Sequence, residues 1–233
     1  MKVLGIDTAS GFASVAVIDG DRVLADTRSD TSGHRADLLV LVDDVCARAG
    51  VSALQLDGVA IGAGPGSFTG LRIGMATAKG IAFAAQRPLW AVSSLAALAH
   101  AELARDPSGD VVAVLDARRG EIYVGAYRHT PAAGEAARGS VELVGDERVI
   151  APGALAAFAP PGARFVGDAA DAYPELAPLP GTWRQTPSGA SVAALALAGA
   201  RVDVLVRGVP TYIRPSEAEV NYPDGVPGAL RKR

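Results

Sequence analysis

The sequence is poor in the residues that build disulfides and metal sites. Its 233 residues include one cysteine, Cys46, and three histidines, His34, His100 and His129. A single cysteine excludes an intramolecular disulfide and a cysteine-based zinc site, and it fits a reducing compartment. The histidines are too widely spaced for the paired ligands of a helical metal motif. We therefore expect no metal site and no catalytic residue in this chain, since a Gly-x-Ser-x-Gly nucleophile motif is absent too.

Long apolar runs and an excess of basic charge are also missing. No apolar stretch reaches the roughly 20 residues that a membrane-spanning helix needs, and the opening MKVLGIDTAS lacks the apolar core of a signal peptide. The 22 Lys and Arg are outnumbered by 25 Asp and Glu, giving a net charge of −3. A stand-alone nucleic-acid binder usually carries a basic stripe. We expect a cytoplasmic protein that stays out of membranes and reaches nucleic acid only through partners.

The patterns that are present indicate an α/β protein. Hydrophobic residues make up 49% of the chain, enough for a packed globular core. In the first half, apolar runs and turn signals predict three strands, then alternating helices and strands. The expected strands are 3–6, 13–18, 22–28, 56–61 and 89–92, and the expected helices are 35–49, 67–85 and 95–105.

In the second half of the chain, the pattern of apolar residues is less regular. The polar segment 106–110 is the best candidate boundary. It divides the chain into an N-terminal lobe, residues 1–105, a smaller C-terminal lobe, residues 106–217, and a tail, residues 218–233. Beyond it we expect strands at 111–115, 122–127, 141–149 and 164–166, helices at 153–158 and 191–200, and an irregular proline-rich segment at 174–187.

Two polar turns could carry chemistry. Asp7, Thr8 and Ser10 lie on a tight turn between two expected strands, where a carboxylate and hydroxyls can hold phosphate directly or through a metal. A plain hairpin turn uses the same residues. The second turn contains Arg118 and Arg119, which could bind a carboxylate or phosphate, or could be solvated charges of a hairpin.

A stripe of small residues runs along the helix expected at 67–85. Gly66, Gly70, Gly74, Ala78 and Ala82 recur every four residues and therefore share one helix face. Each glycine inside a helix costs about 1 kcal/mol relative to alanine, so a close neighbour should offset that cost. The neighbour is either another part of this chain or another subunit, and the stripe alone does not decide between them.

Several longer motifs together resemble one family, the TsaB (YeaZ-type) subunits of the bacterial machinery that makes threonylcarbamoyladenosine in tRNA. The most specific is the segment GPGSFTGLRIG at 64–74. The others follow in matching order, and the resemblance extends from about residue 2 to 215. They are LGIDT at 4–8, His34 with the leucines at 38–39, AKG at 78–80, VSSL at 92–95, DARRGE at 116–121 and YIR at 212–214.

The resemblance implies an actin-like ATPase fold of two lobes, with mixed sheets covered by helices and a reduced second lobe. It implies a non-catalytic subunit that pairs with a TsaD-type catalytic subunit, which transfers threonylcarbamoyl to N6 of adenosine 37 of tRNA. A TsaE-type ATPase would bind this pair, and the chain could pair with itself when the partner is absent. No cofactor is expected in this chain alone; ATP or ADP and a metal are expected in the partners.

The resemblance also assigns residues. Asp7, Thr8 and Ser10 would form a vestigial phosphate loop, and the first two helices would carry the subunit contact. The implied interface residues are Leu38, Val42, Gly66, Gly70, Arg72, Gly74, Ala78 and Ala82. An alternative is a free-standing small-molecule kinase of the same fold, which would use Asp7 with a second carboxylate, Asp116 or Asp168.

Overall fold

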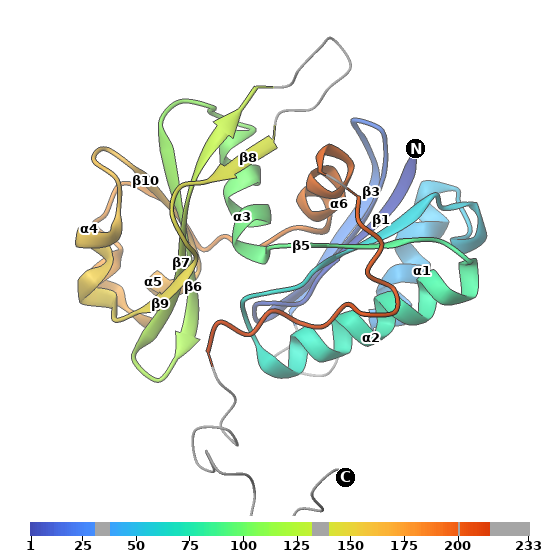
Figure 1. Cartoon of the computed structure of the whole chain (residues 1–233), viewed down its shortest axis with the longest axis horizontal. Coiled ribbons are helices and arrows are strands. Elements are labelled where there is room, and N and C mark those ends of the chain that lie inside the picture. Colours follow the sequence, from blue (N-terminus) through green and yellow to red (C-terminus); the bar gives the residue numbers. More distant parts are fainter. Residues whose placement is uncertain (31–37, 132–139, 200, 215–233) are drawn as a thin grey trace, which may run out of the picture.

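The computed structural model describes residues 1–30, 38–131, 140–199 and 201–214, and it contains two mixed sheets (Figure 1). The first sheet has the strand order β3-β2-β1-β4-β5. Its antiparallel meander β1–β2–β3 is followed by parallel β4 and β5, as the sequence predicts. The bounds are β1 Lys2–Asp7, β2 Phe12–Asp19, β3 Arg22–Asp30, β4 Gly58–Gly62 and β5 Leu89–Val92.

The second sheet repeats this arrangement. Its order is β11-β10-β6-β7-β8, with β9 also paired to β7, so β6 and β7 are antiparallel and β10 and β11 are parallel to β6. The two lobes therefore share one strand order. The bounds are β6 Asp110–Arg118, β7 Glu121–Thr130, β8 Ser140–Leu143, β9 Arg148–Ile150, β10 Arg164–Gly167 and β11 Gly181–Trp183.

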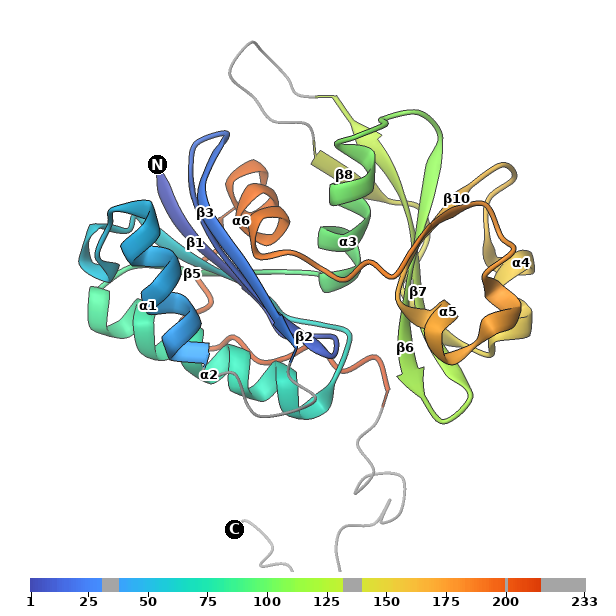
Figure 2. The ribbon, with the colours of Figure 1, turned by 180° about the vertical axis from the view of Figure 1, so that it is seen from behind.

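Helices cover both faces of each sheet because the central strands are buried on both sides. In β1, Val3 and Leu4 are fully buried and belong to different core clusters. Figures 1 and 2 show α1 (Leu38–Ala49) and α2 (Phe68–Ala85) on the outer face of the first sheet, with α6 (Gly189–Ala198) on its inner face. On the second sheet, α3 (Ser94–Leu103) packs on the inner face. The short helices α4 (Leu155–Phe158) and α5 (Ala169–Ala172) cover the outer face.

The inner helices cross between the lobes. Helix α3 follows the first sheet in sequence but packs against β6 and β7, whereas α6 follows the second sheet but packs against β1 and β2. Glycines permit the close approach of α6: a Cβ on Gly5 would lie 2.0 Å from the carbonyl oxygen of Gly189. The Gly189 N–H also donates to the Ser14 hydroxyl, 3.0 Å away. The lobe division expected at residue 106 stays a prediction. Helix α6 follows that residue in sequence, but it packs against the sheet that precedes it.

The chain returns to the first lobe after α6 through residues 201–214, which we call the strap. The strap N–H of Val204 donates to the Leu89 carbonyl of edge strand β5 at 2.8 Å, and that of Thr211 donates to the Ala63 carbonyl at 2.7 Å. The strap therefore covers the edge of the first sheet and the glycine-rich loop that precedes α2.

Two sequence predictions in the second lobe were wrong in detail. The strand expected at 141–149 is divided into β8 and β9, because Gly145 has φ +86° and turns the chain between them. The segment expected to be irregular, 174–187, contains strand β11, which pairs in parallel with β10. Helix α1 begins at Leu38 in the part of the chain that the structure describes; the expected start at residue 35, and His34, lie outside it.

Within the described ranges, none of the helices has the length and apolar character that crossing a bilayer requires.

Candidate functional site

The turn after β1 places Asp7 inside the first lobe. Its side chain is buried; Oδ1 accepts the Ala9 N–H at 2.9 Å and Oδ2 accepts the Ser94 hydroxyl at 2.7 Å. Burial raises the pKa of this carboxyl to about 6, although the hydrogen bond from Ser94 opposes the shift. A side chain at Gly62 would collide with the carboxylate, since its Cβ would lie 1.8 Å from Oδ2.

The two hydroxyls of this turn are also engaged within the chain. The Thr8 hydroxyl donates to the Gly70 carbonyl of α2 at 2.8 Å, and the Ser10 hydroxyl accepts the Phe12 N–H at 3.2 Å. The three residues share one turn, and Thr8 holds the start of α2 against the end of β1, whereas Asp7 bonds to Ser94 at the start of α3. Asp7 is 1% exposed, so its carboxylate is not presented at the surface, as the kinase alternative needs.

At the corresponding end of the second sheet, Asp116 near the end of β6 lies beside Asp168, which follows β10. The Asp116 N–H donates to Asp168 Oδ1 at 3.1 Å, and the Tyr173 hydroxyl donates to Asp116 Oδ1 at 3.3 Å. Burial raises the pKa of Asp168 to about 6, assisted by the neighbouring Asp116 charge. No three His, Cys, Asp or Glu side chains gather as a metal site would require, within the described part of the chain.

The glycine stripe of α2 faces this chain's own first sheet. A Cβ on Gly66, Gly70 or Gly74 would lie 2.1–2.3 Å from atoms of the β1 turn. Ala78 and Ala82 have no exposed surface and belong to the core of the first lobe. Of the two interpretations left open by the sequence, the structure supports internal packing, so these five residues do not form an outward interface.

The remaining predicted interface residues separate into two groups. Leu38 and Val42 of α1 are buried, each 6% exposed, in the same core. Arg72 is exposed; its Nε donates to the Tyr212 hydroxyl at 3.1 Å, and its guanidinium carbon lies 3.6 Å from the centre of the Phe68 ring. Among the eight residues predicted for the interface, Arg72 is the one with an outward side chain.

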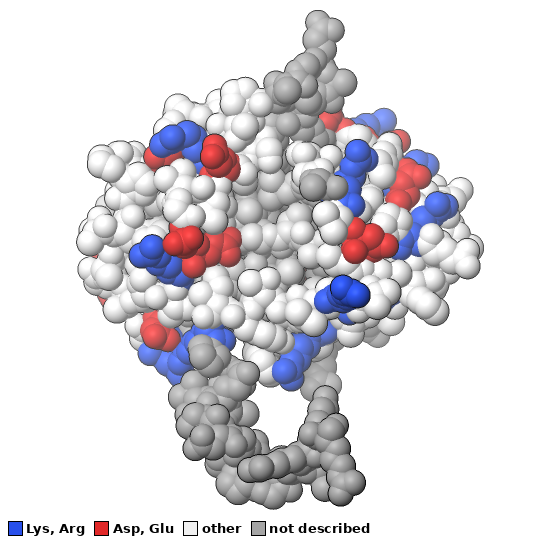
Figure 3. Space-filling model, in the orientation of Figure 1, with Lys and Arg blue, Asp and Glu red and all other residues white. Residues whose placement is uncertain are grey.

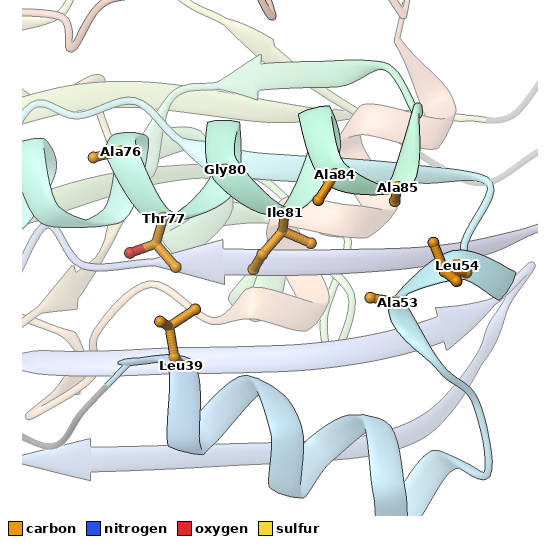
Figure 4. Close-up of a pocket in the computed structure, with 9 residues that line it drawn as sticks. All are labelled: Leu39, Ala53, Leu54, Ala76, Thr77, Gly80, Ile81, Ala84 and Ala85. Atoms are coloured by element: carbon orange, nitrogen blue, oxygen red, sulfur yellow. The ribbon is translucent and has the colours of Figure 1, made fainter.

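An apolar groove of about 580 Å³ lies between α2, α1 and residues 53–54. Figure 4 shows Leu39 of α1 pointing across it toward Thr77 and Ile81 of α2, with Leu54 at its far end. Leu39 and Leu54 are 57% and 66% exposed. The full lining is Leu39, Ala53, Leu54, Ala76, Thr77, Gly80, Ile81, Ala84 and Ala85.

Sequence reasoning missed this groove although a signal for it was present. The outer face of α2 also carries Ile73 and Phe83, which are 48% and 76% exposed. A helix that is apolar on more than one face is buried on more than one side. The buried stripe accounts for one side of α2, whereas the second apolar stripe is left exposed in this chain.

Comparison with protein families gives one extended match. A family model described as TsaD, tRNA N6-adenosine threonylcarbamoyltransferase, matches residues 29–220. The Escherichia coli (strain K12) protein named tRNA threonylcarbamoyladenosine biosynthesis protein TsaB is 37% identical over 128 residues, which are 55% of this chain and 55% of that protein. The chain thus spans about half the length of the curated relatives that it matches.

Comparison with solved structures covers more of the chain. YeaZ from Pseudomonas aeruginosa matches 91% of this chain and 99% of its own at 29% identity, with a TM-score of 0.75. Another Pseudomonas aeruginosa protein, described as similar to the peptidase YeaZ, matches with the same coverage and TM-score at 32% identity.

The fold defined by these observations is an actin-like ATPase fold. Its two lobes repeat one strand order, and the second is reduced, since α5 has 4 residues where α2 has 18. The chain belongs to the family of the threonylcarbamoyltransferase model, and within that family it is similar to the TsaB, or YeaZ-type, proteins.

Proposed function

We propose that this chain is a non-catalytic subunit that activates a TsaD-type catalytic subunit in the transfer of threonylcarbamoyl to N6 of adenosine 37 of tRNA. The observation that carries the proposal is the apolar groove between α1 and α2, together with the family to which the chain belongs. The groove lies on the two helices through which the family resemblance expects the subunits to meet.

The groove has the chemistry of a protein contact. Burying an exposed Leu side chain contributes roughly 1.5–3 kcal/mol, and Leu39 and Leu54, which line the groove, are both more than half exposed. The partner would supply an apolar helix pair of its own, because the catalytic subunit is a homologue of the same fold. A second copy of this chain would fit the same groove when that subunit is absent.

Activation requires no catalytic group in this chain. A subunit that binds one conformation of its partner more tightly than another shifts the partner toward that conformation. In this proposal the nucleotide and the metal reside in the partners, a TsaE-type ATPase binds the assembled pair, and the complex works in the cytoplasm. Both carboxylate oxygens of Asp7 accept hydrogen bonds from within this chain, which favours a non-catalytic subunit over the kinase alternative.

The proposal is tested by filling the groove. Ala84 is exposed on α2 and lines the groove, so Ala84→Arg places a long cation in it without disturbing the core. We expect the affinity for the TsaD-type subunit to fall at least tenfold, which corresponds to about 1.4 kcal/mol. Size-exclusion chromatography and isothermal titration calorimetry with the purified subunits measure the change.

A matched control makes the same exchange elsewhere. Ala156→Arg is also exposed and helical but lies on α4, in the second lobe, and it should bind the partner normally. Equal binding by the wild type and both variants would place the contact elsewhere. ATP turnover by the isolated wild-type chain, lost in Asp7→Ala, would instead favour the kinase alternative.

A further inference from the structure

One edge of the molecule joins three segments that are distant in sequence. Arg72 of α2 donates to Tyr212 of the strap, 3.1 Å away. Two residues further on, Arg214 Nη1 donates to the Ala117 carbonyl at 3.2 Å, directly before Arg118 in the β6–β7 turn. A continuous line of contacts therefore runs from α2 of the first lobe through the strap to the β6–β7 turn of the second lobe. We call this line the arginine edge.

The outward layer of the arginine edge is cationic. It carries the guanidinium groups of Arg72, Arg118 and Arg119, and the Arg118 side chain is 80% exposed. Arg214 is less exposed, at 24%, than the Glu121 side chain with which it pairs, at 39%. Asp116 and Glu121 pair with Arg118 and Arg214, respectively, and Asp168 is bonded under the turn; the Asp116 side chain is only 12% exposed. Figure 3 shows Lys and Arg groups along the lower edge of the molecule, although the net charge of the whole chain is −3.

Two exposed aromatic rings lie in the same edge. The Phe68 and Tyr212 ring centres are 5.2 Å apart, and the side chains are 39% and 43% exposed. The guanidinium of Arg72 stacks on Phe68. Aromatic rings and arginine planes side by side are the groups on which proteins stack unpaired RNA bases, while the other arginines bind phosphates.

The β6–β7 turn presents its arginines in an uncommon backbone conformation. Arg118 and Arg119 have φ +64° and +57°, in the left-handed region that side-chain-bearing residues seldom adopt. The Arg118 N–H is fixed by a 2.7 Å bond to Asp116 Oδ1. The turn therefore holds two adjacent cationic side chains at the tip of the β6–β7 hairpin, at the end of the second sheet.

We propose that the arginine edge binds the phosphate backbone of the tRNA substrate directly. This inference rests on the proposed function, and it goes beyond the expectation that the chain meets tRNA only through its partners. Adjacent guanidinium groups beside exposed aromatic rings fit a ligand that carries both phosphates and bases, and RNA carries a phosphate at every nucleotide.

The test uses this chain in complex with the TsaD-type subunit, and an unmodified tRNA transcript as the probe. Arg118→Glu/Arg119→Glu reverses the charge at the turn, and Arg118→Gln/Arg119→Gln only removes it. We expect the glutamate variant to bind the transcript at least tenfold more weakly near 0.1 M salt, and the glutamine variant to lose less. Removing two phosphate contacts should lower the slope of log K against log [salt] by about 1.4–1.8.

A control variant with the same change in net charge distinguishes the loss of a local contact from a general repulsion between this chain and the RNA. Arg22→Glu/Arg105→Glu changes the net charge by the same amount, but Arg22 lies at the β2–β3 turn and Arg105 follows α3, near the start of β6. This control should bind the transcript like the wild type. Unchanged affinity and salt slope in the Arg118/Arg119 variants, or an equal loss in the control, would overturn the inference.

Co-elution of the two subunits without RNA reports on the proposed function separately. If the Arg118→Glu/Arg119→Glu variant loses the subunit contact, the edge is a protein interface and the RNA inference is wrong. If the wild-type subunits do not associate, the proposed function fails. The same salt series with the full-length chain alone then decides whether the edge binds tRNA.

Discussion

At the scale of single residues, Asp7 makes stability depend on pH in an unusual direction. Its pKa is about 6 in the folded chain, against an ordinary value of 3.8 for an aspartate, so the folded state binds the proton more tightly than the unfolded state. The free energy of unfolding should therefore fall as pH rises from about 4 to 6, by about 3 kcal/mol for this group. Asp168 shifts in the same direction, so the effect of Asp7 has to be isolated by substitution.

Asp7→Asn removes the titration; its Oδ1 can still accept the Ala9 N–H, and its Nδ2 can donate to the Ser94 hydroxyl, which reverses that bond. We expect the variant to gain stability relative to the wild type as pH rises from 4 to 7, measured by urea unfolding at each pH. Asp19 gives a control of opposite sign, because its bond from the N-terminal ammonium lowers its pKa. Asp19→Asn should differ from the wild type by a nearly constant amount from pH 4 to 7, because a lowered pKa places the titration of Asp19 below about pH 4. A difference between wild type and Asp7→Asn that is independent of pH would contradict the assignment.

At the scale of one element, α2 contains two glycines with opposite roles. A Cβ on Gly74 would lie 2.2 Å from Thr8 Oγ1, whereas a Cβ on Gly80 would meet nothing within 4 Å. We expect Gly74→Ala to destabilise the fold and Gly80→Ala to stabilise it by about 1 kcal/mol, the difference in helix propensity. Urea unfolding of both variants measures this, and equal effects would show that the stripe does not pack on the β1 turn.

The sequence predicted the type of each helix or strand more reliably than it predicted the elements against which each one packs. The period-four stripe located α2 and its packed face, but it could not say whether that face met this chain or another. The reason is physical: small residues permit close approach without specifying what approaches. For the same reason, the apolar helices α3 and α6 were predicted, yet their exchange between sheets was not. Their length and composition carry no information about which sheet each one covers.

The candidate site was predictable only in part. The clustering of Asp7, Thr8 and Ser10 followed from their shared turn, but their internal bonds to Ser94 and Gly70 depend on residues more than 60 positions away. Such long-range hydrogen bonds leave no local pattern in the sequence. The groove combines α1, α2 and residues 53–54, so it too becomes visible only after the chain has folded.

At the scale of the whole molecule, the first lobe depends on residues from the other end of the chain. The inner face of the first sheet, including Val3, Ala60 and Trp90, packs with α6. We expect a fragment of residues 1–105 to remain without cooperative structure, because it would leave this apolar face uncovered. Circular dichroism and Trp90 fluorescence during thermal unfolding measure it, and a sharp transition in the fragment would show an independent lobe. Joining residues 187–214 to the fragment through a flexible linker should restore cooperative folding.

The position of α6 also has a consequence for synthesis on the ribosome. Because α6 ends at Ala198, the first sheet cannot be enclosed until most of the 233 residues have been translated and have left the exit tunnel. Local pairing of β1, β2 and β3 can form early, but the lobe that bears the α1–α2 groove is completed late. Truncated nascent chains would thus lack a completed α1–α2 groove. Such incomplete chains could not bind the proposed partner subunit, because the order of the elements along the chain delays completion of the groove.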